Sequence, residues 1–104
     1  MQFLPLNNSD WQLFLKWAAT EGWTISSQEL RLFQDQWRSS FFVLRAEGKV
    51  TGFVSAVAYE ESGWIGNLLV GSEHRGQGYG AVLFDFILAL LLSLIHISEP
   101  TRPY

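Results

Sequence analysis

The sequence contains no cysteine in its 104 residues. This absence excludes disulfide bonds, thiolate nucleophiles and metal sites that are built on thiolates. Basic residues are also few, since seven Lys and Arg stand against ten Asp and Glu and give a formal net charge of −3. A chain without an excess of basic residues is not expected to bind nucleic acid, because the phosphate backbone attracts clustered positive charge.

The sequence does not lead us to expect a targeting segment either. The first five residues, Met1-Gln2-Phe3-Leu4-Pro5, lack the basic start and the long apolar run of a secretory signal peptide. Residues 86–97 are nearly all apolar and are bracketed by Asp85 and Pro100. It is shorter than the roughly 20 residues that a membrane-spanning helix requires. We therefore expect a cytoplasmic protein that does not interact with a membrane, folded as a single small domain.

The first half of the chain has the patterns of one short strand and two helices. Residues 2–6 are a strand candidate that ends at a proline and two asparagines. A capping-box signature that begins at Ser9 predicts a helix, and Gly22 supplies its C-terminal stop. A second capping box predicts another helix over Ser27–Trp37.

From residue 40 onward the pattern changes to strands. β-Branched and aromatic residues predict three of them, over Phe41–Ala46, Val50–Tyr59 and Trp64–Val70. The connections Glu47-Gly48 and 60–63 are too short for parallel crossovers, so the strands should form an antiparallel meander. A helix over 78–91 should then pack on one face of the sheet. The predicted order is β-α-α-β-β-β-α.

A glycine-dense loop joins the last predicted strand to the last helix. It reads Gly71-Ser72-Glu73-His74-Arg75-Gly76-Gln77-Gly78-Tyr79-Gly80, and Arg75 is its only Lys or Arg. Glycine lets a ligand approach bare backbone N–H groups, and a helix start adds unpaired N–H donors and the positive end of the helix dipole. The loop is therefore a candidate phosphate site.

Two phosphate-binding motifs match this loop incompletely. Gly71 and Gly76 have the spacing of a P-loop, but Gln77-Gly78 stands where a lysine and a hydroxyl residue are required, so we reject that interpretation. Gly76, Gly78 and Ala81 match the dinucleotide fingerprint G-x-G-x-x-G/A, although five residues separate this pattern from the strand before it. A dinucleotide-binding oxidoreductase fragment with a parallel sheet remains an alternative.

A third motif fits the loop and its flanks better. Arg75-Gly76-Gln77-Gly78-Tyr79-Gly80 resembles the Arg/Gln-x-x-Gly-x-Gly/Ala signature of the GNAT (Gcn5-related) N-acetyltransferases, and Leu68-Leu69-Val70 resembles the strand end that precedes it in that family. One departure is Ser72, which stands where the family usually has proline. The resemblance extends from about Phe3 to Leu90. It implies an α+β fold, the three-layer acyl-CoA N-acyltransferase fold, in truncated form.

The resemblance also implies a cosubstrate and its binding residues. The loop amides would hold the pyrophosphate of acetyl-CoA, and the preceding strand would pair with the pantetheine arm. The residues that carry this expectation are Leu68, Leu69, Val70, Arg75, Gly76, Gln77, Gly78, Tyr79 and Gly80. The acetyl group would pass to the amine of a small-molecule or peptide acceptor. A CoA-binding module without catalysis is a further alternative.

Catalytic residues are not identified by any motif in the chain, and no metal site or oligomeric state is predicted. The proton donor of the family is often a tyrosine beyond a strand that this sequence does not contain. His74 is expected to be a solvated loop residue rather than a base. Arg75 could pair with a phosphate or with Glu73. Asn67 and Tyr59 could face an acceptor, but strand parity leaves their side open.

The last thirteen residues, Leu92 to Tyr104, do not continue the family pattern. Back-translation of Leu92 to Arg102 gives a sequence that resembles a transposase-type sequencing adapter read in frame. We therefore expect residues 1–91 to be part of an acetyltransferase domain and residues 92–104 to be an artefactual tail. On this interpretation the C-terminal half of the domain is missing, and the fragment itself should be inactive.

Overall fold

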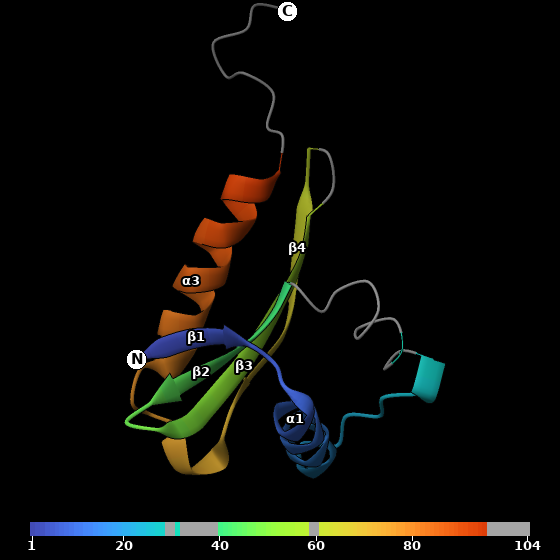
Figure 1. Ribbon diagram of the computed structural model, residues 1–104, viewed down its shortest axis with the longest axis vertical. Coiled ribbons are helices and arrows are strands. Elements are labelled where there is room, and N and C mark those ends of the chain that lie inside the picture. Colours follow the sequence, from blue (N-terminus) through green and yellow to red (C-terminus); the bar gives the residue numbers. More distant parts are fainter. Residues whose placement is uncertain (29–30, 32–39, 59–60, 96–104) are drawn as a thin grey trace, which may run out of the picture.

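The computed structural model describes residues 1–28, 31, 40–58 and 61–95 (Figure 1). Its elements are β1 (Gln2–Pro5), α1 (Asn8–Thr20), β2 (Phe41–Ala46), β3 (Lys49–Ala58), β4 (Gly63–Val70), the short 3-10 helix η2 (Ser72–His74) and α3 (Tyr79–Leu94). The order of strands and α-helices in this part is β-α-β-β-β-α, which corrects the predicted order β-α-α-β-β-β-α. Most of the second helix, predicted over Ser27–Trp37, falls on residues outside the described ranges.

The four described strands form one sheet in the order β1-β2-β3-β4, and each neighbouring pair is antiparallel. The predicted meander is therefore confirmed. Glu47 and Gly48 make the turn between β2 and β3 with φ angles of 54° and 77°, and positive φ at both central residues is typical of a tight type I′ hairpin. The dinucleotide alternative required a parallel sheet, and the described strands contain no parallel pair.

Helices cover both faces of the sheet, so the fold has three layers (Figure 1). Alternation along β2 divides its side chains between two hydrophobic clusters, because successive residues of a strand point to opposite faces. Phe41 and Val43 pack with α1, whereas Leu44 packs with α3. The expected helix on one face of the meander is thus confirmed, and it extends to Leu94 rather than to residue 91.

Helix α1 begins two residues earlier than the sequence pattern indicated. Its N-cap is Asn7, whose side-chain oxygen accepts a hydrogen bond from the Asp10 N–H at 2.8 Å, while the Asp10 carboxylate accepts one from the Asn7 N–H at 3.0 Å. Ser9, the predicted cap, lies inside the first turn. The end of the helix is as predicted, because Gly22 has the left-handed φ of 79° that a C-terminal stop requires.

Asp10 also ties α1 to the sheet. Its carboxylate lies 2.6 Å from the guanidinium of Arg45 in β2, and the residue is only 3% exposed. A charge in such a buried position is tolerated because it is paired and hydrogen-bonded. This one side chain therefore stabilises both the helix start and the contact between α1 and β2.

We expect Asp10→Ala to lower the free energy of unfolding by about 2–3 kcal/mol, because it removes the side-chain half of the capping box and leaves Arg45 without its partner, while the hydrogen bond from the residue 10 N–H to the Asn7 side chain is kept. Urea unfolding measures the loss. Asp10→Asn retains an oxygen that can accept the cap hydrogen bond and should cost less. A loss below about 0.5 kcal/mol for Asp10→Ala, the size of an ordinary surface substitution, would contradict this role.

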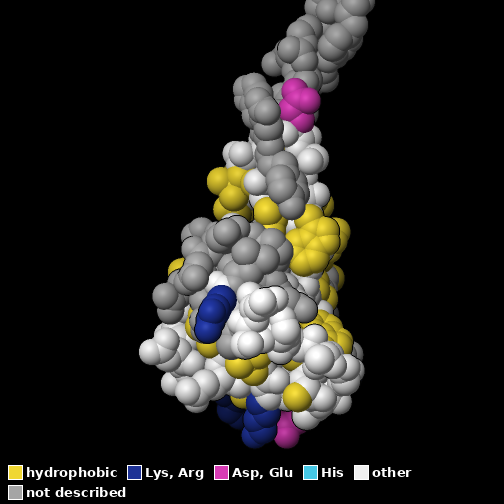
Figure 2. Space-filling model, turned by 90° about the vertical axis from the view of Figure 1, so that its right-hand side faces the viewer, with side chains coloured by type: hydrophobic (Ala, Val, Ile, Leu, Met, Phe, Trp, Pro, Cys, Tyr) yellow, Lys and Arg dark blue, Asp and Glu magenta, His cyan; other side chains and the backbone are white. Residues whose placement is uncertain are grey.

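Figure 2 shows how the described basic side chains are spread over the α1 face of the molecule. On this face, the described Lys and Arg side chains occupy small separate areas with hydrophobic side chains between them, rather than one broad basic surface. No helix in the described part of the chain is both long and apolar enough to cross a membrane.

Candidate functional site

The glycine loop runs from the end of β4 to the start of α3. Gly71 begins it by donating its N–H to the Thr51 carbonyl oxygen at 2.9 Å, and the turn closes when the His74 N–H donates to the Gly71 oxygen at 2.8 Å. Gly76 and Gly78 then adopt φ angles of 77° and 87°. A Cβ at either glycine would meet nothing within 4 Å. The backbone conformation, rather than lack of room, is what requires glycine at these two positions.

Helix α3 begins with unsatisfied donors. Gly78 is its N-cap and has no side chain to cap the helix, and no acidic residue lies in the first turn. The first helical hydrogen bond runs from the Val82 N–H to the Gly78 oxygen at 3.2 Å. Within the described residues, the N–H groups of Tyr79, Gly80 and Ala81 therefore have no backbone acceptor. These donors and the positive end of the helix dipole favour an anion at this position.

Arg75 joins the loop to the end of α1. Its Nε donates to the Val70 carbonyl oxygen at 3.2 Å, and its guanidinium lies 2.7 Å from the carboxylate of Glu21. The side chains of Arg75 and Glu21 are 47% and 34% exposed, so water weakens this pair. The sequence left a phosphate or Glu73 as possible partners of Arg75. In the described structure, Arg75 pairs with Glu21 and not with Glu73.

A bulge interrupts β4 just before the loop. Phe53 pairs with Leu69 but Ser55 pairs with Gly66, so two residues of β4 oppose one residue of β3. Asn67 occupies the bulge with a φ of 52°, a conformation that asparagine tolerates better than most residues. This bulge was not predicted, although an asparagine beside Gly66 within a strand pattern is a signal for it.

Hydrogen bonds to a buried serine hold the bulge in place. The Ser55 hydroxyl donates to the Gly66 carbonyl oxygen at 3.1 Å and accepts a hydrogen bond from the Asn67 side-chain N–H at 2.9 Å. The Asn67 side chain therefore points toward β3. Tyr59, its predicted companion near an acceptor, lies outside the described residues.

The predicted strand residues lie at the end of β4, directly before the loop. Leu69 is buried against the α1 cluster, and Leu68 and Val70 are half-buried against the α3 cluster. Among the described strands, β4 has β3 as its neighbour on one edge only. Its other edge is the side from which an extended ligand could pair with the backbone.

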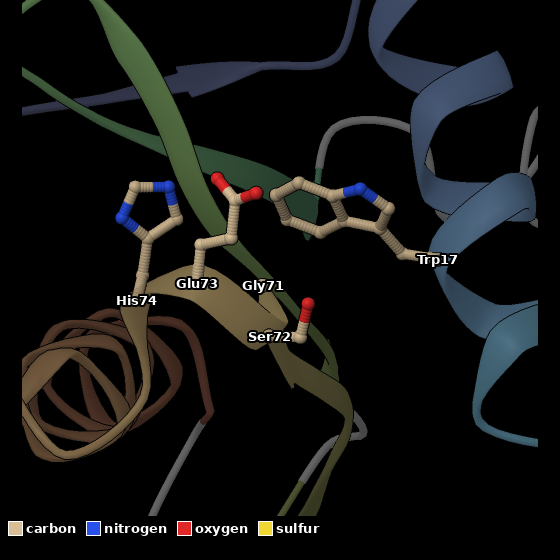
Figure 3. A pocket seen from close by; sticks show the side chains of 5 residues that line it. All are labelled: Trp17, Gly71, Ser72, Glu73 and His74. Atoms are coloured by element: carbon tan, nitrogen blue, oxygen red, sulfur yellow. The ribbon is translucent and has the colours of Figure 1, made fainter.

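A pocket of about 170 Å³ lies between α1 and η2 (Figure 3). It is lined by Trp17, Gly71, Ser72, Glu73 and His74. His74 was expected to be solvated, but it is half-buried and its ring lies 6.1 Å from that of Tyr79. Trp17 was not singled out from the sequence, because its contact with the turn is a tertiary one.

No group of three or more potential metal-ligating side chains occurs in the described part of the chain.

The sequence model of the Acetyltransferase (GNAT) family matches residues 5–99. The chain belongs to the GNAT family. The glycine loop and β4 both lie inside the matched range. No curated protein matches the chain at the level of sequence.

Solved GNAT-like structures share this fold. Ard1 from Thermoplasma volcanium superposes with a TM-score of 0.74 at 24% identity, over 92% of this chain and 66% of that one. Rv2747 from Mycobacterium tuberculosis, solved with CoA, gives a TM-score of 0.73 at 19% identity over 93% of this chain. Glucosamine-6-phosphate N-acetyltransferase from Arabidopsis thaliana gives 0.68 at 18% identity, over 96% of this chain and 82% of that one.

Because the sequence identities to these solved structures are below 25%, the similarity shows a shared fold. The GNAT chain described here spans 60% of the length of the Mycobacterium protein and 66% of Ard1. The predicted α+β class with an antiparallel sheet and the predicted family are thus confirmed.

Proposed function

We propose that the whole protein is an N-acetyltransferase that moves the acetyl group of acetyl-CoA to the amine of a small molecule or peptide. The observation that carries this proposal is the loop from Arg75 to Gly80. Two glycines in left-handed conformation lead into a helix that begins without a capping side chain. Membership of the GNAT family supplies the chemistry that such a loop would serve.

The proposed role of the loop is to hold the pyrophosphate. Amides of the first turn of α3 would donate to phosphate oxygens, and the dipole of the helix would favour their negative charge. Gly76 and Gly78 leave the loop backbone open to a ligand, since a Cβ at either meets no described atom within 4 Å. Gln77 and Tyr79 flank these amides, and Gly80 adds a donor without a side chain.

The strand before the loop would hold the pantetheine arm. Leu68, Leu69 and Val70 present the backbone of the strand edge that no other described strand covers. The bulge at Asn67 lies at the start of this segment. In the family a backbone N–H near the point where two strands separate polarises the thioester carbonyl, and we propose that the bulge of β4 does this here.

Acetyl transfer then requires a neutral amine that attacks the thioester carbonyl carbon. The tetrahedral adduct collapses with loss of the CoA thiolate, and the proton leaves the new amide nitrogen. Binding at the loop and β4 would contribute by holding the two reactants in place, which can remove several kcal/mol from the barrier. We assign no side chain of the described residues as the base or the acid.

Calorimetric titration of the chain with CoA tests the proposal. CoA should bind, and pantetheine, which has no pyrophosphate, should bind at least about tenfold more weakly, because it cannot use the loop amides. Equal affinity for the two ligands, or no binding of CoA, would refute the loop as the site. Release of free CoA from acetyl-CoA in the presence of an amine then separates an enzyme from a CoA-binding module.

Glu21 should compete with phosphate for Arg75. We expect Glu21→Gln to raise the affinity for CoA by about two- to fivefold, because an exposed ion pair is worth less than about 1 kcal/mol. The gain should shrink as salt is added. Glu47→Gln removes the same charge at the exposed turn between β2 and β3 and is the matched control. A lower affinity in Glu21→Gln would show instead that Glu21 positions Arg75 for the ligand.

We also propose, from the adapter resemblance, that residues 92–104 do not belong to the domain that residues 1–91 begin. In support, Leu92, Ser93 and Leu94 are exposed. Against it, α3 continues to Leu94, Ile95 is half-buried against the α3 cluster, and the family model extends to residue 99. Sequencing the gene from its source DNA beyond codon 91 tests this proposal. A match to the codons for all thirteen residues would overturn it.

A further inference from the structure

The pocket between α1 and η2 is a second concave feature beside the glycine loop. It lies on the α1 side of the sheet, and residues 71–74 line it rather than residues 75–80, which form the phosphate loop. Its volume of about 170 Å³ suits a group of a few heavy atoms, since pockets for drug-sized ligands measure about 300–1,000 Å³. The pocket is therefore a candidate binding site that is separate from the phosphate loop.

An indole ring, an imidazole ring and a carboxylate are the largest side-chain groups of its lining (Figure 3). The Trp17 indole extends from α1 toward the turn, and the Glu73 carboxylate points toward that ring, with the His74 ring on its other side. None of the described residues that line the pocket is a Lys or Arg. Among the described residues, Arg45 pairs with Asp10 and Arg75 pairs with Glu21, and no ion pair forms with Glu73.

The indole is held in place before any ligand arrives. Its ring packs edge-on against Phe53 of β3, with 5.5 Å between the centroids. A Cβ at Gly71 would come within 2.6 Å of the same ring, so glycine at this position allows the close approach. A fixed aromatic face reduces the entropy that a ligand must lose on binding.

From this arrangement we infer that the pocket binds the ammonium group of a small amine. A cation over an indole face is attracted by the ring quadrupole, and tryptophan is the strongest of the aromatic side chains in this respect. The Glu73 carboxylate and the Ser72 hydroxyl oxygen can accept hydrogen bonds from N–H donors. An anion would be repelled by Glu73, and an apolar group would remove water from the carboxylate without replacing its hydrogen bonds.

The bound ammonium group is not the one that receives the acetyl group. Gly71 lies four residues beyond Asn67 along the chain, which corresponds to about 13 Å in an extended strand. An acceptor that reaches both points would carry a second, distal amine. The inference of a second amine rests on the proposed function, because it assumes that acetyl transfer takes place at the bulge. The inference that the pocket binds an ammonium group does not depend on the proposed function.

Three probes of the same length test the charge preference of the site. The chain is titrated by calorimetry with 1,4-diaminobutane, with neutral 1,4-butanediol and with anionic succinate. We expect the diamine to bind at least about tenfold more tightly than the diol, given one cation–π contact and one charge-assisted hydrogen bond. Succinate should not bind. Equal binding of the diamine and the diol would overturn the inference.

Substitutions then place the diamine in the pocket. Glu73→Gln keeps the shape of the side chain and should weaken diamine binding about fivefold, as expected for loss of an exposed charge pair. Asp85→Asn removes the same charge from α3 on the opposite side of the sheet and should leave it unchanged. Equal effects of the two variants would show a general charge effect and would refute the site.

Trp17→Leu removes the aromatic face and should weaken diamine binding by a further factor of about two to five. Because Trp17 packs on Phe53, circular dichroism must show that the variant is folded, and Glu73→Gln keeps the inference testable if it is not. The titration with CoA separates the two claims. CoA binding without diamine binding refutes the amine site alone, and diamine binding without CoA binding refutes the proposed phosphate loop alone.

Discussion

A Gly78→Val variant is expected to lose at least about 100-fold in CoA affinity, or close to 3 kcal/mol of binding free energy. Gly78 has a φ of 87° and is the N-cap of α3. Valine is β-branched and adopts positive φ only with strain, so the backbone would turn away and the following amides would lose their common direction. The new side chain would also project from the loop that the pyrophosphate is proposed to contact. Calorimetric titration with CoA measures the loss.

Gly48→Val is the matched control for this variant. Gly48 has a φ of 77°, and a Cβ there also meets nothing within 4 Å, but it lies in the turn between β2 and β3. Both substitutions should lower the free energy of unfolding by about 1–3 kcal/mol through the same backbone strain. Only Gly78→Val should affect CoA. Unchanged CoA affinity in Gly78→Val, or an equal loss in both variants, would refute the assigned role of the loop.

The sheet could be predicted because its signals are local. Runs of β-branched and aromatic residues mark β2, β3 and β4, and Glu47-Gly48 marks a tight turn that only an antiparallel pair can use. The glycine loop was equally visible, since Gly76 and Gly78 both adopt the positive φ that glycine permits. Local backbone preference decides these features, and a sequence records it directly.

The predicted start of helix α1 was wrong by two residues. The sequence pattern assigned Asn7 to the turn after the first strand and placed the N-cap at Ser9, because a Gln follows Ser9 at the spacing of a capping box, but Asn7 is an equally good capping residue. The helix begins at the earlier cap because Asp10 then completes the capping box and also reaches Arg45 on β2. The partner on the sheet decided the start of the helix, and that partner is 35 residues away in the sequence.

The features around the candidate site that were missed depend on packing between distant segments. Trp17 meets Gly71 only when α1 lies across the end of β4, and Glu21 meets Arg75 for the same reason. Neither contact leaves a periodic pattern in the sequence. The bulge at Asn67 could be predicted in part. An asparagine within a strand indicates a bulge, but the residues of β3 that face the bulge depend on the contact with Ser55.

The position of α1 therefore decides much of the candidate site, and Phe14 is one of the buried residues that hold α1 on the sheet. Phe14 is 0% exposed. Its ring lies 4.9 Å from that of Phe41, 5.4 Å from Phe53 and 6.5 Å from Trp23, all in edge-to-face arrangements. Its contacts thus join α1 to β2 and β3 through pairs that add to the burial of the ring.

We expect Phe14→Ala to lower the free energy of unfolding by about 3–5 kcal/mol, through lost burial and the cavity left behind. That is a large share of the roughly 5–15 kcal/mol that stabilises a typical domain. Urea unfolding followed by circular dichroism measures it. Phe84→Ala in α3 removes the same ring from a residue that is 44% exposed, and it should cost less than about 1.5 kcal/mol.

An equal loss in both variants would show that the aromatic cluster does not hold α1 on the sheet. If Phe14→Ala is the more damaging change, as we expect, its effect should reach the site through α1. Trp17 lies one helical turn from Phe14, and Glu21 follows one turn later, so loosening the helix moves both away from residues 71–75. Diamine binding should then fall in folded Phe14→Ala and stay unchanged in Phe84→Ala, because α3 does not line the pocket.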